Sequence, residues 1–512
     1  MILIHPPIVK PSEPPPGLAR LAGALLAHGV ECQLVDANLE GILWLLGQEW
    51  KPGDTWSNRA VRNRGRNLTA LRKGTTYLSP DRYRRAVNDV DRVLRLAGAP
   101  GIQIGLGNYR HTLLSPVKSG DLIRAAEEES LNPFYPYFRE RLENLLEKSP
   151  SQIVGFSLNY LSQALTTFAM AGFLKKKFPE KKIVLGGGLV TSWMRRPGWS
   201  NPFRGLVDYL VAGPGEEALL ALAGIELKPD LHCMPEYSLL PVDLYLAPGL
   251  ILPYSASTGC YWSGCAFCPE RAEGSPYDKT PDPVAAKDLR DLTRKLKPSL
   301  IHIVDNALSP SLMKGLALDP PGAPWYGFAR ITPHLTDPGF CAALRKSGCV
   351  MLKVGLESGD QAVLDAMHKG TDLTVSSDAL KALKKAGIAT YVYLLFGTPT
   401  ETEETAGKTL SYTAAHADLI DFLNVAVFNL PVNSQEAGVL ETVDFYEGDL
   451  SLYRDFTHPE GWGRKQVRTF LAKEFRKNAA IQAIIRRDPP VFTSNHAAFL
   501  CDFSFDNFPC RI

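Results

Sequence analysis

Three cysteines, Cys260, Cys265 and Cys268, fall within nine residues in the run GCYWSGCAFCP. A glycine-containing loop can fold three thiolates around one metal centre, whereas a β-strand would turn neighbouring side chains to opposite faces. Structural zinc takes four ligands, and no fourth cysteine or histidine lies nearby in the sequence. Three thiolates suit a four-iron cluster whose fourth iron stays open to a small molecule. The alternatives are a zinc site that recruits a distant ligand and cysteines that only fill the core.

The cysteine loop follows an apolar strand at about 250–258. Five further strands are predicted at 299–305, 325–331, 350–358, 389–397 and 421–430. Helical segments lie between them, around 283–297, 339–347, 375–386 and 402–416. Six β/α units predict a parallel TIM-type barrel or part of one, with its site at the carboxyl ends of the strands.

Polar residues stand at the ends of these predicted strands. They are Asp305 and Asn306, Arg330, Glu357 and Ser358, and the run GTPTE at 397–401. Because parallel strands end at the same edge, packing alone does not explain polar groups at so many of them. Taken singly, each is equally well explained as a helix cap.

In the first 240 residues, short apolar strands alternate with helices. The strands are MILIHPP, ECQLVDA, SQIVGFSL, KKIVLGGG and VDYLVAG. This pattern predicts an α/β fold with a doubly wound, Rossmann-like parallel sheet, whose ligands bind beyond the carboxyl ends of the strands. The residues there are Asp36, Ser157, Tyr160, Gly186, Gly187, Gly188, Gly213 and Glu216.

A dinucleotide site is not expected in this sheet, because no G-x-G-x-x-G run follows the first strand. Asp36 is therefore interpreted as a capping or turn residue. The triple glycine at 186–188 either lets a bulky ligand approach the backbone or forms a flexible turn.

A segment at about 42–148 interrupts the sheet pattern and is mostly helical in periodicity. Between 51 and 95 it carries 12 Lys/Arg against 4 Asp/Glu, and between 121 and 147 it carries 7 acidic against 3 basic residues. One interpretation is a helical insertion whose charged faces meet each other or water. The other is a basic wall that receives an anionic substrate.

The chain has 512 residues, 45% of them apolar, and a net charge of +2 from 56 basic and 54 acidic residues. We expect one Rossmann-like domain at 1–240, with the insertion at about 42–148 inside it, a barrel at 250–450, and a small helical region at 451–512 that covers the barrel mouth. The charge balance predicts no nucleic-acid partner. No apolar run approaches the ~20 residues of a membrane helix, and the N-terminus does not read as a signal peptide, so a cytoplasmic location is expected.

Over about 1–40 and 150–450 the chain resembles the radical S-adenosylmethionine (SAM) superfamily, and within it the class with an N-terminal cobalamin-binding-type domain. The barrel motifs that carry the resemblance are the three-cysteine loop with Phe267 before its third cysteine, the strand that ends at Asp305, GLESG at 355–359 with KG at 369–370, and YLLFGTPTET at 393–402. The N-terminal motifs are HPP, PPPGLARLAGAL, Gly155-Phe-Ser-Leu, the triple glycine and Gly213-x-Gly-Glu216.

The resemblance implies that Cys260, Cys265 and Cys268 hold a [4Fe-4S] cluster and that SAM chelates its open iron. One-electron reduction would cleave SAM to a 5′-deoxyadenosyl radical. Phe267 would lie near the adenine of SAM, Glu357 and Ser358 would face its ribose or methionine end, and Arg330 would pair with its carboxylate. Asp305 would also bind cofactor. Ser157, Tyr160, Gly186–Gly188, Gly213 and Glu216 would face cobalamin.

The implied activity is methylation of a small molecule or natural-product intermediate, with reduced flavodoxin or ferredoxin as electron donor. The alternatives are a non-methylating cyclisation, rearrangement or oxidation, with cobalamin as electron carrier or absent, and a scaffold with a structural cluster. Two departures from the family pattern stand out. The spacing is C-x4-C-x2-C rather than C-x3-C-x2-C. No D-x-H-x-x-G follows the first strand, and Asp230-Leu-His232 matches only half of it, with Pro235 in place of the glycine.

Overall fold

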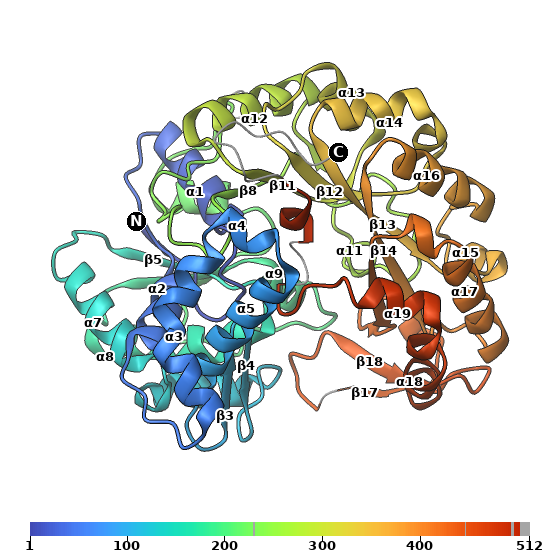
Figure 1. Cartoon of the computed structure of the whole chain (residues 1–512). Helices are drawn as coiled ribbons and strands as arrows, with labels where there is room; N and C mark the ends of the chain where they lie inside the picture. The colour runs from blue at the N-terminus through green and yellow to red at the C-terminus, as the bar shows by residue number, and fades with distance from the viewer. Residues whose placement is uncertain (229–230, 446, 493–495, 502–512) are drawn as a thin grey trace. The chain divides into compact units, whose positions relative to one another are not determined.

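The computed structural model describes residues 1–228, 231–445, 447–492 and 496–501. Within it the chain divides into two compact units (Figure 1). The first comprises 1–76, 81–249 and 446–452, and the second comprises 77–80, 250–445 and 453–512. Asp230 of the half-matched motif lies outside the described residues. So does Cys510, a cysteine near the C-terminus that is not part of the three-cysteine loop.

The first unit is built on a five-stranded parallel sheet in the order β2-β1-β5-β6-β7. Its strands are β1 (Ile2–Ile4), β2 (Gln33–Val35), β5 (Ile153–Ser157), β6 (Lys182–Gly186) and β7 (Tyr209–Leu210). The chain runs first to one edge and then returns to the other side of β1. The strand order therefore reverses between β1 and β5, the place where doubly wound sheets bind their ligands. The predicted sheet is confirmed.

Helices connect these strands and pack on the sheet. They are α1 (Pro16–Ala27), α8 (Leu161–Lys177), α9 (Gly188–Met194) and α10 (Glu216–Leu222). Residues 163–174 of α8 are buried throughout, because α6 covers it as well as the sheet. A Cβ added at Gly172 would collide with the backbone of Ala126 in α6, so a glycine is needed at this close crossing.

The insertion is mainly helical, as predicted. Its helices are α2 (Ala37–Gly47), α3 (Thr55–Leu71), α4 (Gly74–Tyr77), α5 (Pro80–Arg95), α6 (Ser119–Glu127) and α7 (Tyr135–Leu146). It also contains an unpredicted hairpin, β3 (Ile102–Gly105) and β4 (Asn108–His111), whose turn donates to Asp91 Oδ1 through Leu106 N at 2.9 Å. Asp36 caps α2 by accepting from Leu39 N at 2.9 Å, as expected.

The second unit contains a six-stranded parallel sheet in chain order, β8-β11-β12-β13-β14-β15. Its strands are β8 (Ile251–Tyr254), β11 (Leu300–Leu308), β12 (Trp325–Ala329), β13 (Cys349–Glu357), β14 (Ala389–Phe396) and β15 (Phe422–Val427). Helices α12 (Asp282–Leu296), α13 (Pro310–Leu318), α14 (Pro338–Lys346), α15 (Gln361–Ala366), α16 (Leu373–Lys385) and α17 (Glu403–Ala415) follow the strands. Figure 1 shows these helices along the outer side of the curved sheet. This is the predicted partial barrel.

The C-terminal part differs from a single helical segment. Strand β18 (Tyr453–Phe456) pairs with β16 (Leu430–Pro431) and β17 (Thr442–Asp444) in a small antiparallel sheet. Helical periodicity runs through about 464–487 of the expected helical region, but the structure divides this stretch into α18 (Arg464–Lys473) and α19 (Ala479–Ile485). Asn478 caps the second helix by accepting from Ala480 N at 3.0 Å. Among the described helices, none combines the length and apolar character that a membrane crossing needs.

Candidate functional site

The cysteine loop is held at both of its ends. Strand β9 (Ser257–Thr258) pairs antiparallel with β10 (Asp278–Lys279), so the loop begins and ends at one short ribbon. Gly259 opens it with φ of +69°, and a Cβ there would collide with the carbonyl of Pro276. Only glycine therefore fits the start of the loop.

Asp305 and Asn306, in the second half of β11, tie that strand to the loop. Asp305 accepts from Ala256 N at 2.7 Å and from Ser257 Oγ at 2.5 Å, and Asn306 Nδ2 donates to Gly259 O at 3.2 Å. Burial raises the pKa of Asp305, although these hydrogen bonds favour its ionised form. Both carboxylate oxygens of Asp305 thus already have partners in the protein.

All three cysteines are free and half-buried. Burial raises the pKa of Cys265 and Cys268, and the charges of Lys369 and Arg330 act in the opposite direction on Cys265. The described part of the chain has no group of three His, Cys, Asp or Glu side chains set around one metal ion. A four-iron cluster makes a different demand, because each thiolate binds its own iron. Three half-buried thiols beside two cations fit that donor set.

Arg330, directly after β12, contacts one of the loop sulfurs. Its Nη1 donates to Cys265 Sγ at 3.7 Å, and its Nη2 donates to Lys369 O at 2.5 Å. Its guanidinium lies 4.1 Å from the centre of the Trp262 ring. The side chain is only 7% exposed, so its charge acts in a largely dry setting.

Glu357 and Lys369 form a buried ion pair at 2.7 Å, at the end of β13. Glu357 has φ of +66°, a conformation that non-glycine residues seldom adopt. Gly355 makes room for the pair, because a Cβ at this position would collide with Glu357 Oε1 and lie 2.7 Å from Lys369 Nζ. Lys369 also lies 5.5 Å from the ring centre of Phe267, which packs with Val363, Leu364 and Met367.

Ser358 is fully buried beside this ion pair. Its Oγ lies 3.1 Å from Thr409 Oγ1 and accepts from Asp360 N at 3.1 Å. Asp360 caps α15 by accepting from Val363 N at 3.0 Å. The hydroxyl of Ser358 therefore anchors the turn that carries Glu357.

Glu401, after β14, is fully buried. Its Oε2 accepts from Gly397 N at 2.5 Å and from Trp462 Nε1 at 3.0 Å, while its Oε1 has no hydrogen-bond partner among the described residues. Burial raises the pKa of Glu401 to about 7. This carboxyl joins the GTPTE turn to the segment before α18.

One face of the barrel sheet is aromatic and basic. The strand registers pair His302 with Tyr326, and Lys353 with Phe328 and Tyr391. His302 stacks on Tyr326 with ring centres 4.4 Å apart, and Lys353 Nζ lies 4.9 Å and 4.8 Å from the rings of Tyr326 and Phe328. The intervening positions of these strands are buried and largely aliphatic, and helices α14 and α16 contact β13 and β14. The polar face is therefore the concave one.

The candidate residues of the first unit lie at the carboxyl ends of β5, β6 and β7. Asn159 joins two of these ends, since its Nδ2 donates to Ser157 Oγ at 3.0 Å and its Oδ1 accepts from Gly188 N at 2.9 Å. Gly187 has φ of +107°, and a Cβ there would run into Leu158 O. A Cβ added at Gly186, by contrast, would make only ordinary van der Waals contacts.

Gly213 N, after β7, donates to Thr191 Oγ1 at 2.9 Å, and Glu216 forms an ion pair with Arg20. Tyr160, 59% exposed, precedes α8. Hydrogen bonds also join the loop after β1 to the first turn of α8, because Gln163 Nε2 donates to Pro6 O at 2.8 Å and Ser162 Oγ donates to Ile8 O at 2.7 Å. The predicted residues thus share the edge of the sheet where the strand order reverses.

Sequence reasoning gave no role to several of these residues. Lys369 was part of a motif without a partner, and Trp262, Trp462, Asn159 and Lys353 were not singled out. The one signal that the sequence offered for Lys353 was a lysine inside an otherwise apolar strand. The structure shows this side chain fully buried, which is rare for lysine.

Comparison with known proteins agrees with this geometry. Residues 254–413 match the family model of the radical SAM superfamily. An uncharacterized methyltransferase, PH0819, of Pyrococcus horikoshii is 26% identical over 239 residues, which cover 41% of this chain and 50% of that protein. The anaerobic magnesium-protoporphyrin IX monomethyl ester cyclase of Rubrivivax gelatinosus is 32% identical over 88 residues, or 17% of this chain and 16% of that protein. The chain thus spans about half the length of the first of these relatives and less of the second.

Among solved structures, the chain is similar to the radical S-adenosylmethionine methyltransferase TsrM of Kitasatospora setae, determined with a tryptophan substrate and a SAM analog. The TM-score is 0.53 at 15% identity, over 94% of this chain and 88% of that one. The second unit therefore carries a radical SAM domain. Over 94% of its length, the fold of the chain is similar to that of this methyltransferase.

Proposed function

We propose that this chain is a cobalamin-dependent radical SAM methyltransferase that acts on a small molecule. The observation that carries the proposal is the combination of a radical SAM domain, with three thiols on one strand-end loop, and a doubly wound sheet with a glycine-rich edge. The methyltransferase from Pyrococcus horikoshii supports the reaction class. The tryptophan in the Kitasatospora structure supports a small substrate.

For the cluster, we propose Cys260, Cys265 and Cys268 as ligands, one to each of three irons. The chemistry that such a cluster supplies when bound is one-electron reduction of SAM to methionine and a 5′-deoxyadenosyl radical. Arg330 and Lys369 offset the negative charge of the thiolates, because both cations act on Cys265. Burial of Arg330 strengthens that effect.

For SAM, we propose that Phe267 and Arg330 contact the cofactor and that Lys369 orients Glu357 toward it. Asp305 and Ser358 act indirectly, because their polar atoms already bond to Ala256 and Ser257 and to Thr409 and Asp360. They fix the ends of β11 and β13 and so position the groups that touch the cofactor.

For cobalamin, we propose the edge of the first sheet that carries Ser157, Tyr160, Gly186, Gly187, Gly188, Gly213 and Glu216. Gly186 and Gly188 present backbone without a side chain, so a large planar ligand can approach closely. An oxygen-sensitive cluster would require a reducing cytoplasm, with reduced flavodoxin or ferredoxin as the electron donor.

A second candidate is a non-methylating radical reaction, such as a cyclisation, with cobalamin as electron carrier or absent. The observation that favours it is the 32% identity over 88 residues to the Rubrivivax cyclase. The two candidates share the cysteine loop and differ in the fate of the methyl group of SAM.

The test is purification without oxygen from cells supplied with cobalamin, followed by assay of iron, sulfide, cobalamin and SAM products. About four irons and one cobalamin per chain, with S-adenosylhomocysteine alongside 5′-deoxyadenosine, would support methyl transfer. Four irons with 5′-deoxyadenosine alone would support the second candidate. Cys265→Ala should abolish SAM cleavage, and turnover that survives this change would overturn the cluster assignment. Cys341→Ala, which removes a buried cysteine outside the loop, is the control.

A further inference from the structure

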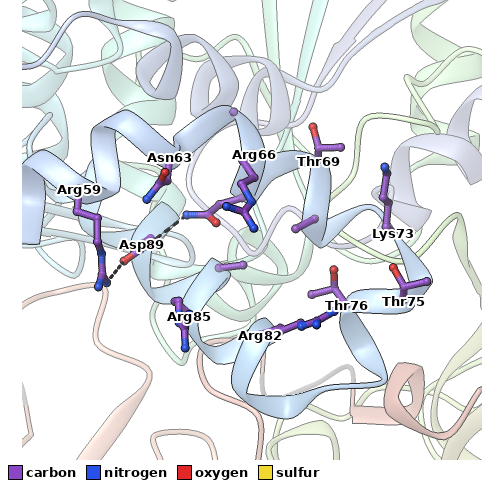
Figure 2. Close-up of a pocket in the computed structure, with 14 residues that line it drawn as sticks. Arg59, Asn63, Arg66, Thr69, Lys73, Thr75, Thr76, Arg82, Arg85 and Asp89 are labelled. Atoms are coloured by element: carbon purple, nitrogen blue, oxygen red, sulfur yellow. Dashed lines mark hydrogen bonds and ion pairs between the residues drawn. The ribbon is translucent and has the colours of Figure 1, made fainter.

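A cavity of about 690 Å³ lies within the insertion. Its lining comes from α3, α4 and α5 and from the turn between α3 and α4, all in the first unit. Figure 2 shows its charged and polar side chains arranged around the gap between these helices. The volume falls in the range of small-molecule sites, and most of the residues that line the cavity are charged or polar.

The lining is strongly basic. It carries Arg59, Arg66, Lys73, Arg82 and Arg85 against one acidic residue, Asp89. Asp89 is buried and already has partners, since it accepts from Arg59 Nη2 at 3.2 Å and from Asn67 Nδ2 at 3.3 Å (Figure 2). Asp89 therefore neutralises Arg59 and leaves four cations on the wall.

These four cations are exposed, and none of them forms an ion pair with any residue that the structure describes. Other arginines of α5 do form ion pairs. Arg84 pairs with Asp81 at 3.3 Å and Arg95 with Asp91 at 2.7 Å, both along α5 and both outside the cavity lining. The acidic residues of α5 thus pair with Arg59, Arg84 and Arg95. The positive charge of the four other cations in the cavity lining is therefore not balanced.

The neutral part of the lining adds hydrogen-bond donors of the kind that phosphate oxygens accept. Asn63, Thr69, Thr75 and Thr76 place an amide and three hydroxyls beside the cations. An arginine fork matches the oxygens of a phosphate in a bidentate manner, and lysine adds a point charge. Several like charges around one cavity repel each other, and a ligand with several negative groups would relieve that repulsion.

We propose that this cavity binds a small polyanion with a di- or triphosphate group. The proposal does not rest on the proposed function, because its residues belong to the insertion alone and its test needs no turnover.

The experiment is isothermal titration of the full chain, purified without oxygen, with inorganic tripolyphosphate at about 0.15 M salt, where long-range attraction between exposed charges is largely screened. The variant is Arg66→Ala with Arg85→Ala, one exposed arginine from each wall. The matched control is Arg62→Ala with Arg92→Ala, which removes the same charge from the same helices outside the lining.

We expect the natural protein to bind tripolyphosphate and the cavity variant to bind it about a hundredfold more weakly, roughly tenfold for each charge-assisted contact. The control should stay within about threefold, because it loses only screened long-range attraction. Absence of binding to the natural protein, or an equal loss in the control, would overturn the site.

ATP should compete with tripolyphosphate and citrate should compete at least about tenfold less well, since its carboxylates are planar and singly charged. Equal competition by citrate would overturn the phosphate assignment, and tighter binding of a short DNA duplex would overturn the small-molecule assignment.

Discussion

Arg330 donates a hydrogen bond to the sulfur of Cys265 across 3.7 Å. The same guanidinium lies against the ring of Trp262, which stands three residues before that cysteine. One buried cation thus links the end of β12 to the middle of the cysteine loop. A charge-assisted bond to sulfur in a low-dielectric site favours the thiolate over the thiol.

We predict that Arg330→Lys keeps iron in the protein but lowers SAM cleavage by about ten- to a hundredfold. Lysine keeps the charge, but it loses the planar fork that allows stacking on Trp262 and simultaneous donation to Cys265. The measurement is iron content together with the rate of 5′-deoxyadenosine formation. Arg271→Lys is the control, because Arg271 donates to Gly264 O at 2.7 Å in the same loop. An equal loss in both variants would assign the effect to loop folding rather than to the sulfur contact.

A second prediction concerns Gly355, which makes room for the Glu357–Lys369 pair. Gly355→Ala forces the new methyl group into both side chains, and the free energy of unfolding should fall by about 1–3 kcal/mol, as for other overpacked sites. Gly407→Ala, within α17 and with no atom near the added methyl, should instead raise it by about 0.5–1 kcal/mol. Denaturant unfolding measures both. A Gly355→Ala protein as stable as its parent would show that the pair moves without cost.

The sequence was sufficient for the parts of the molecule that depend on local periodicity. Short apolar strands that alternate with helices predicted both sheets. Polar residues at the strand ends, such as Arg330, predicted the edge that carries the site. Parallel order follows from the alternation of strands and helices, because a crossover helix returns the chain to the same edge.

The partners of those residues could not be predicted, because they depend on loops that meet from distant parts of the chain. Lys369 reaches Glu357 from beyond α15, and Trp262 meets Gly370 across more than a hundred residues. The turn at Asn478 was missed for another reason. The apolar spacing continues through it, and only the cap geometry shows that a new helix begins.

Glu401 leads to a prediction about pH. Burial raises its pKa from 4.5 to about 7 in the folded protein. Between these values the unfolded chain loses the proton and the folded chain keeps it, so the free energy of unfolding falls as the pH rises through this window. The full difference is on the order of 3 kcal/mol. Glu401→Gln keeps an acceptor for Gly397 N and Trp462 Nε1 but cannot ionise.

We therefore expect Glu401→Gln to be more stable than the natural protein at pH 8, with the advantage shrinking as the pH falls toward 5. Unfolding by denaturant at a series of pH values measures it. Glu403→Gln, at an exposed position in the first turn of α17, should show no such dependence on pH. A constant difference between Glu401→Gln and its parent across the window would show that Glu401 does not titrate there.

Two glycines of the triple glycine are expected to serve different purposes: the fold requires Gly187, whereas Gly186 leaves room for a ligand. Gly187→Ala should lower the free energy of unfolding by about 2 kcal/mol or more, because φ of +107° strains an alanine and its Cβ meets the backbone of Leu158. Gly186→Ala should leave stability unchanged, since its Cβ would meet Val211 only at 3.6 Å. If cobalamin lies against this edge, Gly186→Ala should still lower the cobalamin bound per chain, by about tenfold for a displaced planar contact. Absorbance of the protein purified with cobalamin gives that ratio, and iron content gives the internal control. A Gly186→Ala protein with full cobalamin would place the corrin away from β6, and one that loses iron as well would show that the change acts through folding.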